Sequence, residues 1–262
     1  MHRLPSPPRP RWMLRAPHLA RGFPGWWTLL VQLVLVAAAA LLYFGVRGLT
    51  QSDLETALEN ARALVRFEVA VGIDWEGWVQ SLVIDHDALV ALVNWIYIYG
   101  HWPVVGVSLT VLFLRFPDRF YLLRNALFVS GAIGLIVFAT LPVAPPRLGG
   151  LDLVDTVTER SDAYRTLQPP GLINRYAALP SLHFGWNLLV GVILWRTTRQ
   201  PWVRTFALVL PALMAFAVVA TANHYVIDVV AGGVVALTGL PLARLIPRVR
   251  PSPRWARSPG DA

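Results

Sequence analysis

Long apolar runs alternate with short polar segments along the whole chain. Six runs carry no charge or almost none, and they span residues 22–46, 88–114, 125–146, 176–195, 205–227 and 229–243. A helix needs about 20 residues to cross a bilayer, so the first five runs are long enough. The sixth is long enough only if its helix begins near His224, which would place Asp228 in its outer turns. The pattern therefore predicts six transmembrane helices.

Composition supports a membrane protein. Hydrophobic residues make up 55% of the 262 residues and charged residues 15%, whereas soluble domains average about 25% charged residues. The first run is long for a cleaved signal peptide, and we expect a retained signal-anchor. There is no cysteine, so disulfides and zinc–sulfur sites are excluded. We expect an all-α integral membrane protein with its six helices in a bundle.

The arginines give the expected orientation. All 23 basic residues are arginine, and with the N-terminus inside, 16 of them fall in inner segments together with only two acidic residues. The positive-inside rule then predicts that both termini are cytoplasmic. Because these arginines separate apolar runs and do not form one recognition face, we expect no binding to nucleic acid. We expect a membrane domain over 22–248 between disordered Arg- and Pro-rich tails at 1–20 and 249–262.

Two outer segments are long. Segment 47–87 starts with a capping-box sequence at Ser52–Glu55, and apolar residues follow at helical spacing. This pattern predicts amphipathic helices at the outer surface, which either lie on the bilayer or pack on the bundle. Segment 142–179 is rich in proline and glycine, and a loop of that length is often functional or disordered.

Three polar clusters interrupt the apolar pattern, and the charge-derived topology places all three at the outer face. They are PVAPPRLGG with Arg147, LPSLHFGW with Ser181 and His183, and TANHYVID with His224 and Asp228. Ionisable residues at the ends of membrane spans often mark functional sites. We therefore treat the three clusters as one candidate site.

The third cluster is typical of an activated nucleophile. His224 and Asp228 are four residues apart, which makes them neighbours on one helix face. An aspartate that accepts the proton of one imidazole nitrogen leaves the other nitrogen free to attack. The remaining groups suit an anion: Pro180 and Ser181 favour a helix N-terminus, His183 could move a proton, and Arg147 presents a planar fork of donors. This set predicts phosphoryl transfer through a phosphohistidine, with no metal or cofactor.

Each residue also has a simpler structural interpretation. The histidine–aspartate pair could be an intrahelical hydrogen bond, Ser181 a helix cap and Arg147 a snorkelling boundary residue. Two histidines and an aspartate could instead hold zinc. A transporter or a membrane scaffold is an alternative of another class, although the ionisable residues gather at one face and do not cross the membrane.

The second and third clusters resemble signature blocks of the type 2 phosphatidic acid phosphatase superfamily. The matching residues are Leu-Pro-Ser181-Leu-His183 and His224-Tyr-Val-Ile-Asp228, and Ala-Pro-Pro-Arg147 is similar to the first block. The resemblance implies that His224 is the nucleophile, Asp228 its partner and His183 the proton donor to the leaving oxygen. It implies that Arg147 and Ser181 bind the phosphoryl group.

The residues of the first and third blocks are most similar to those of the inositol phosphorylceramide synthase branch. The phosphatase-type first block begins with a lysine, which this chain lacks, and Ala217-Val218 replace the Ser-Arg of the third block. The resemblance implies a lipid phosphate substrate at the outer face of the cell membrane, with a lipid or polyol hydroxyl, or water, as acceptor. The alternative is a plain lipid phosphate or prenyl diphosphate phosphatase. Four polar residues form a stripe on the second predicted span and could line a headgroup pocket or make interhelical hydrogen bonds: Asn94, Tyr97, Tyr99 and His101. Arg175 and Tyr176, just before the second cluster, could help to bind substrate or close a loop.

Overall fold

The computed structural model describes residues 26–49, 54–160 and 176–246. Within these ranges the chain is helical, and a single β-bridge joins Val143 to Ala177. The predicted disordered tails and Ser52 of the predicted capping box lie outside the described residues.

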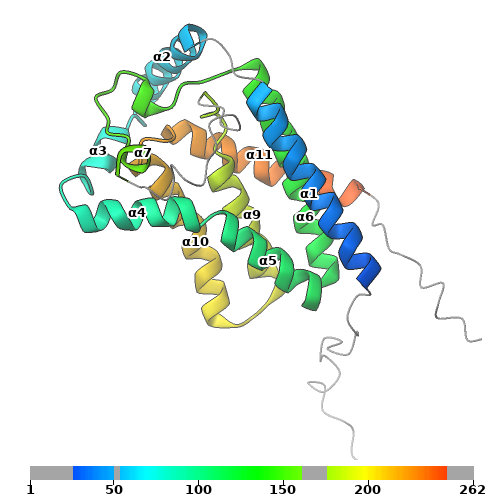
Figure 1. The fold of residues 1–262 in the computed structure, drawn as a ribbon. Helices are drawn as coiled ribbons and strands as arrows, with labels where there is room; N and C mark the ends of the chain where they lie inside the picture. Colours follow the sequence, from blue (N-terminus) through cyan, green and yellow to red (C-terminus); the bar gives the residue numbers. More distant parts are fainter. Residues whose placement is uncertain (1–25, 50–53, 161–175, 247–262) are drawn as a thin grey trace, which may run out of the picture.

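The helices follow the predicted runs with shifted ends (Figure 1). Pro117 and Pro201 start two of them, at the position where proline costs no hydrogen bond. The elements are α1 (Trp26–Leu49), α2 (Leu54–Val71), α3 (Glu76–Ser81), α4 (Asp87–Tyr99), α5 (Trp102–Arg115), α6 (Pro117–Thr140), the 3₁₀ helix η2 (Pro146–Leu148), α7 (Thr156–Arg160), α9 (Leu182–Thr197), α10 (Pro201–Ala220) and α11 (Val226–Leu245).

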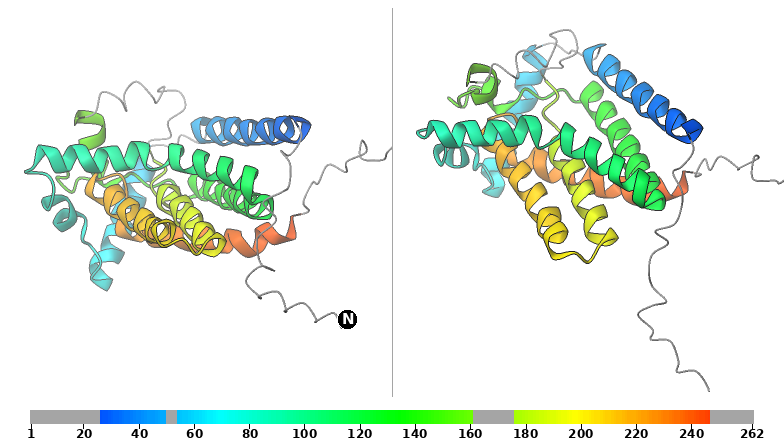
Figure 2. Two further views of the ribbon diagram at one scale, coloured as in Figure 1. Left: turned by 90° about the horizontal axis from the view of Figure 1, so that it is seen from below. Right: turned by 60° about the horizontal axis from the view of Figure 1, so that its bottom comes forward.

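Helix α9 packs between α6, α10 and α11, and α6 also packs on α11. Small residues let these helices approach closely, as is usual in membranes: a Cβ on Gly232 would lie 2.2 Å from the carbonyl oxygen of Ser181. Figure 2 shows α1 alongside α6, outside this central group. The main core, which includes Leu123, Leu189 and Ile193, lies between α5, α6, α9 and α11.

Three helices of the described chain, α6, α10 and α11, are long and apolar enough to cross a membrane. Helices α4 and α5 pass the same test as a pair and add a fourth candidate span with a 43° bend. The apolar part of α1, Trp26–Leu42, and the 16-residue α9 are shorter. The helical fold is thus confirmed for the described residues, with three or four candidate spans, and six crossings remain a prediction.

The bend between α4 and α5 lies just before Pro103, and a proline inside the apolar run 88–114 predicts a kink there. Helix α4 ends at Tyr99, Gly100 and His101 form the break, and Pro103 lies in the first turn of α5. Proline lacks the N–H that would continue the helical ladder to Tyr99, so the chain turns before it. The break brings His101 into the interior of the protein, where it is 2% exposed.

Arg124 is one of the 16 arginines that the charge pattern assigns to inner segments, but it does not lie in a loop. It lies inside α6, is 4% exposed, and donates to Gln32 of α1 and to the neighbouring Asn125. Its guanidinium also lies 5.1 Å from the ring centroid of Tyr121. An arginine can satisfy its donors with neutral acceptors and aromatic faces, so it need not reach the membrane surface.

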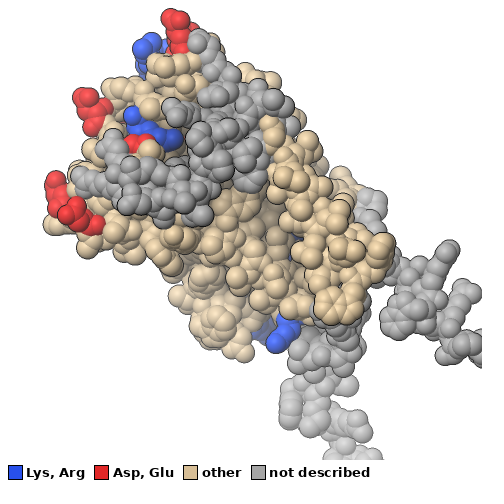
Figure 3. All heavy atoms as spheres, in the orientation of Figure 1, with Lys and Arg blue, Asp and Glu red and all other residues tan. Residues whose placement is uncertain are grey.

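Helices α2 and α3 lie together at one end of the molecule (Figures 1 and 2). Ala57 and Ala61 are fully buried in a cluster with Val143 and Tyr225, so one face of α2 packs on the bundle, as one of the two hypotheses expects. Trp75 and Trp78 remain exposed. On the face drawn in Figure 3, red acidic side chains gather at this end, and the surface below it is almost entirely uncharged.

Candidate active site

Backbone hydrogen bonds join the three sequence clusters pairwise. The N–H of Arg147 donates to the carbonyl of Ala222 at 3.1 Å, which ties the first cluster to the third. The N–H of Ser181 donates to the carbonyl of Asp228 at 2.9 Å, which ties the second to the third. The N–H of Val143 donates to the carbonyl of Tyr176 at 2.9 Å and brings the segment before Arg147 beside the second cluster. Segments far apart in sequence therefore meet at one end of α9, α10 and α11.

His224 lies in the turn between α10 and α11, two residues before α11 begins. This corrects the expectation that His224 and Asp228 share a helix face. The turn is held by the carbonyl of Val218, which accepts from the N–H groups of Asn223 and His224 at 3.1 and 3.0 Å. His224 is 5% exposed. Its ring is thus fixed by a short connection between two packed helices.

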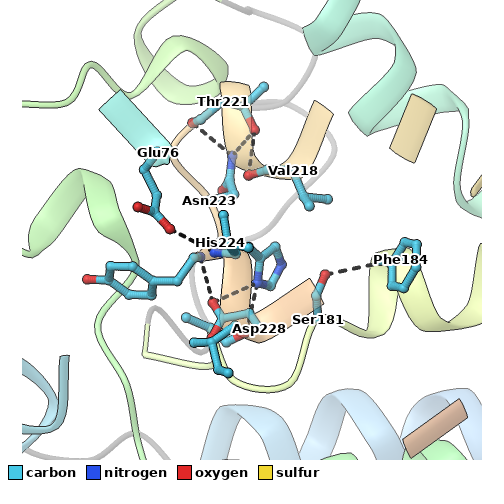
Figure 4. A network of polar contacts seen from close by, with 12 residues as sticks. Glu76, Ser181, Phe184, Val218, Thr221, Asn223, His224 and Asp228 are labelled. Atoms are coloured by element: carbon cyan, nitrogen blue, oxygen red, sulfur yellow. Dashed lines mark hydrogen bonds and ion pairs between the residues drawn. The ribbon is translucent and has the colours of Figure 1, made fainter. Parts of the chain in front are cut away.

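The imidazole of His224 is oriented mainly by a carbonyl group, and Asp228 lies beside it (Figure 4). Its Nδ1 lies 2.7 Å from the carbonyl oxygen of Ala178 and 3.4 Å from Oδ2 of Asp228. Because a carbonyl oxygen only accepts, Nδ1 must carry the proton, and Nε2 of the neutral ring keeps its lone pair. The sequence predicts the carboxylate in this role, but the shorter contact belongs to Ala178.

Asp228 also caps the start of α11. Its Oδ2 accepts the N–H of Tyr225 at 2.9 Å, and Tyr225 is the N-cap residue of the helix. Asp228 is completely buried. A carboxylate in the first turn also interacts favourably with the helix dipole. Asp228 therefore holds the helix start and at the same time places a negative charge near His224.

Ser181 is the N-cap of α9. Its hydroxyl accepts from the N–H of Phe184 at 3.4 Å, a long contact that is drawn in Figure 4. The capping role that the sequence allows is thus present. The N-terminus of α9, with its partial positive charge, faces the region of His224 and Asp228.

His183 lies in the first turn of α9 between two rings from the broken span. Its ring stacks on Tyr97, with centroids 4.6 Å apart and planes at 19°, and its centroid is 4.4 Å from that of His101. The centroid of the His224 ring lies 6.1 Å away. The two histidines of the sequence motif are therefore neighbours in space.

Asn187 connects His183 to His101, and sequence reasoning did not identify it. Its side-chain amide donates to the carbonyl of His183 at 2.8 Å and lies 3.1 Å from Nδ1 of His101. Since the amide nitrogen is a donor, Nδ1 of His101 accepts and the proton of His101 sits on Nε2. The sequence feature that could have identified Asn187 is its position four residues after His183, because an amide at that spacing on an otherwise apolar helix lies on the same face as the histidine.

The polar residues of the second predicted span therefore fall into two groups, those that contact His183 and those that do not. Tyr97 and His101 contact His183, whereas Asn94 exchanges two hydrogen bonds of 2.8 Å with Thr156. Tyr99 is exposed and contacts Trp95. Tyr176 takes part in the bridge to Val143 through its carbonyl, and Arg175 lies outside the described residues.

Arg147 reaches the site through Asn223, the neighbour of His224. Its Nε lies 3.1 Å from Asp155, and its Nη1 donates to the side-chain oxygen of Asn223. Asn223 is held in turn by the hydroxyl of Thr221 at 2.9 Å. Asn223 was not predicted, because only the fold brings residues 76 positions apart into contact. Asp155 and Thr221 were not predicted either, and they act on the site through Arg147 and Asn223.

Across the part of the chain that the structure describes, no three histidine, aspartate or glutamate side chains are grouped so as to hold a metal ion. The residues around His224 are a carbonyl, one carboxylate and the ring of His183. The chemistry that this arrangement suits is nucleophilic attack by an oriented imidazole with a second imidazole nearby.

Comparison with known families matches residues 62–242 to the model of the PAP2 superfamily. The matched region runs from α2 to α11 and contains all five predicted site residues. Comparisons with curated proteins and with solved structures give no match.

Proposed function

This chain belongs to the PAP2 superfamily, the type 2 phosphatidic acid phosphatases, and is a membrane phosphatase or phosphotransferase; from that premise we propose that His224 takes the phosphoryl group of a lipid phosphate. Membership supports a phosphatase-type activity on lipid phosphates. The observation that carries the assignment of His224 is its 2.7 Å contact with the carbonyl of Ala178, which leaves Nε2 unprotonated.

The proposed reaction has two displacements. In the first, Nε2 of His224 attacks phosphorus, the bond to the lipid oxygen breaks, and His183 gives that oxygen a proton. In the second, His183 takes a proton from the acceptor hydroxyl, whose oxygen attacks phosphorus and breaks the N–P bond. A general acid must come within hydrogen-bond reach of the oxygen that it protonates, and ring centroids 6.1 Å apart leave room for a phosphoryl group between the two imidazoles.

Arg147 and the start of α9 are the proposed binding groups for the phosphoryl oxygens. Arg147 is 14% exposed and is aimed by Asp155 and Asn223 toward the loop that carries His224. Ser181 places the positive end of α9 beside the same loop. A guanidinium and a helix N-terminus both interact most strongly with the doubly charged, spreading phosphoryl group of the transition state.

The proposed topology has six crossings, cytoplasmic termini and an active site at the outer face of the cell membrane. Beyond the four candidate spans, α1 and α9 would supply the remaining two. The last turns of α5, α9 and α11 carry Arg115, Arg196 and Arg244, and the positive-inside rule assigns that end to the cytoplasm. The site lies at the opposite end, beside α2 and α3.

The proposed acceptor is a lipid or polyol hydroxyl, as in the inositol phosphorylceramide synthase branch that the sequence blocks resemble. The hypothesis is supported by the alanine and valine at positions 217 and 218, which are completely buried and offer phosphate no donor. Water as the acceptor would make the protein a plain lipid phosphate or prenyl diphosphate phosphatase.

Product analysis separates these functions. Purified protein would be given ³²P-phosphatidate or ³²P-phosphatidylinositol, with and without inositol or a diacylglycerol that carries different acyl chains. A transferase moves label into a product that depends on the acceptor, which is inositol phosphate or a phospholipid with the new acyl chains, whereas a phosphatase releases free phosphate from phosphatidate under all conditions. Both activities should disappear in His224→Ala and persist in His86→Ala, a matched change at an exposed histidine. Turnover that survives in His224→Ala would contradict the proposed function.

A further inference from the structure

The start of α11 is held by two glutamates from distant helices. The first N–H groups of a helix have no partner within it and need external acceptors. Here the N–H of Val226 donates to Glu76 of α3, and that of Ile227 to Glu68 of α2, both at 2.7 Å. Figure 4 shows the carboxyl of Glu76 pointing to the chain just after His224. The partners lie 150 and 159 positions apart in the sequence.

Both glutamates are buried, and their carboxyl groups accept consecutive N–H groups at the start of α11. Glu68 is 0% and Glu76 3% exposed. Two ionised carboxylates held at neighbouring N–H groups in a buried site would repel each other, so such a pair holds a proton between its members. Burial raises the pKa of Glu68 to about 8, with further contributions from the charges of Glu76 and Asp228. Burial also raises the pKa of Glu76.

We propose that Glu68 and Glu76, sharing one proton, are positioning residues that hold the start of α11 and thereby keep His224 in register with the carbonyl of Ala178. The idea deepens the proposed function and rests on it. His224 lies two residues before Val226, so a shift of about 1 Å at the helix start would break the 2.7 Å contact that fixes its tautomer. The outer helices α2 and α3 are thus part of the active-site support.

The shared proton makes this support sensitive to alkaline pH. The groups that face it are all acidic or phenolic: Glu68 from α2, Glu76 from α3, and Tyr225 and Asp228 from the start of α11. His224 contacts only Asp228 among them. Burial, followed by the three carboxylates, raises the pKa of Tyr225, so the phenol stays neutral. Loss of the shared proton therefore leaves three negative charges in one buried cluster and pushes α2 and α3 away from α11.

The test uses alanine and glutamine variants of the full-length protein. Glu68→Ala and Glu76→Ala remove an acceptor, whereas Glu68→Gln keeps the acceptor oxygen and replaces the shared proton with an amide hydrogen. Glu59→Gln is the matched control, because Glu59 is an exposed residue of the same helix. Hydrogen exchange of the peptide that contains Val226 and Ile227 reports the contact directly, whatever reaction the enzyme catalyses. Steady-state kinetics from pH 5 to pH 10 report the function.

We expect both alanine variants to exchange faster in that peptide and to lose about tenfold or more in kcat with KM within about twofold. Glu68→Gln should keep normal exchange and should move the alkaline limb of the wild-type profile, near pH 8, to higher pH. Glu59→Gln should match the wild type.

Normal exchange in both alanine variants would overturn the contact. Faster exchange with unchanged kcat, or a Glu68→Gln profile identical to the wild type, would overturn the positioning role. Activity in His224→Ala would instead count against the proposed function, independently of exchange.

Discussion

The rings of His183 and His224 lie 6.1 Å apart, centroid to centroid, although 41 positions separate them in the chain. His183 is placed by the first turn of α9 and His224 by the turn before α11. The separation leaves room for a tetrahedral group between them, and it gives each ring a different role. His224 is fixed by a carbonyl through one nitrogen, whereas His183 is held between two aromatic rings.

If His183 protonates the leaving oxygen, its importance depends on the leaving group. We expect His183→Ala to lower kcat on an alkyl lipid phosphate by about 10²–10⁴-fold, the usual contribution of a general acid. The loss should be much smaller with p-nitrophenyl phosphate, whose leaving oxygen needs no proton. Parallel kinetics on the two substrates measure this. Equal losses on both would assign His183 to binding or structure.

Asn187 and His101 should act through His183. Asn187→Leu keeps the volume but removes the donor to the His183 carbonyl and to His101, so we expect about a tenfold fall in kcat. The alkaline limb of the pH profile should move as well, because His183 must carry a proton to protonate the leaving oxygen and its surroundings change. His101→Phe keeps a ring beside His183 and should show a weaker form of the same effect. Tyr99→Phe, at an exposed position of the same helix, is the control. A comparable change in kcat or in the pH profile of this variant would contradict an effect that acts through His183.

The close approach of α9 and α11 should not tolerate a side chain at Gly232. A Cβ there would meet the backbone of Ser181 at 2.2 Å, and backbone cannot move aside as a flexible side chain can. We expect Gly232→Ala to destabilise the protein by about 1–3 kcal/mol and to lower kcat, since Ser181 and His183 share the displaced turn. Gly106→Ala, on α5, has no atom within 4 Å of the new Cβ and serves as the control. Unfolding in detergent and activity would be measured together; equal behaviour of the two variants would contradict the expected clash.

The buried carboxyl of Glu68 predicts how stability changes with pH. Its pKa is raised in the folded protein from 4.5 to about 8, so the folded state binds this proton more tightly than the unfolded state. The contribution to stability is largest below pH 4.5, is lost as pH rises toward 8, and is constant above that. The total is a few kcal/mol. Glu68→Gln should remove this slope from the melting temperature in detergent between pH 5 and pH 8, and an unchanged slope would show that another group causes it.

The apolar runs and the three clusters were sufficient to predict the helices, the superfamily and the grouping of Arg147, Ser181, His183, His224 and Asp228. They could not predict that Ala178 orients His224, because a backbone carbonyl carries no residue-specific signal. Arg124 was assigned to an inner loop, since charge patterning cannot separate a snorkelling arginine from one buried against Gln32.

Glu68 and Glu76 were missed for a related reason. On an amphipathic outer helix a glutamate is ordinarily solvated, and only the packing of α2 and α3 on α11 buries these two. His101 was noticed as part of a polar stripe, but its contact with His183 depends on the break that Pro103 causes. Such long-range contacts are properties of the fold and not of local sequence.

Trapping the phosphoenzyme tests the central claim most directly. The purified protein would be mixed with ³²P-labelled lipid phosphate in the presence of EDTA, quenched within milliseconds, and the label on the protein counted. A phosphohistidine on His224 predicts an acid-labile, base-stable adduct that is present in the wild type and in His86→Ala and absent in His224→Ala. An adduct of the same kind that persists in His224→Ala would contradict the account.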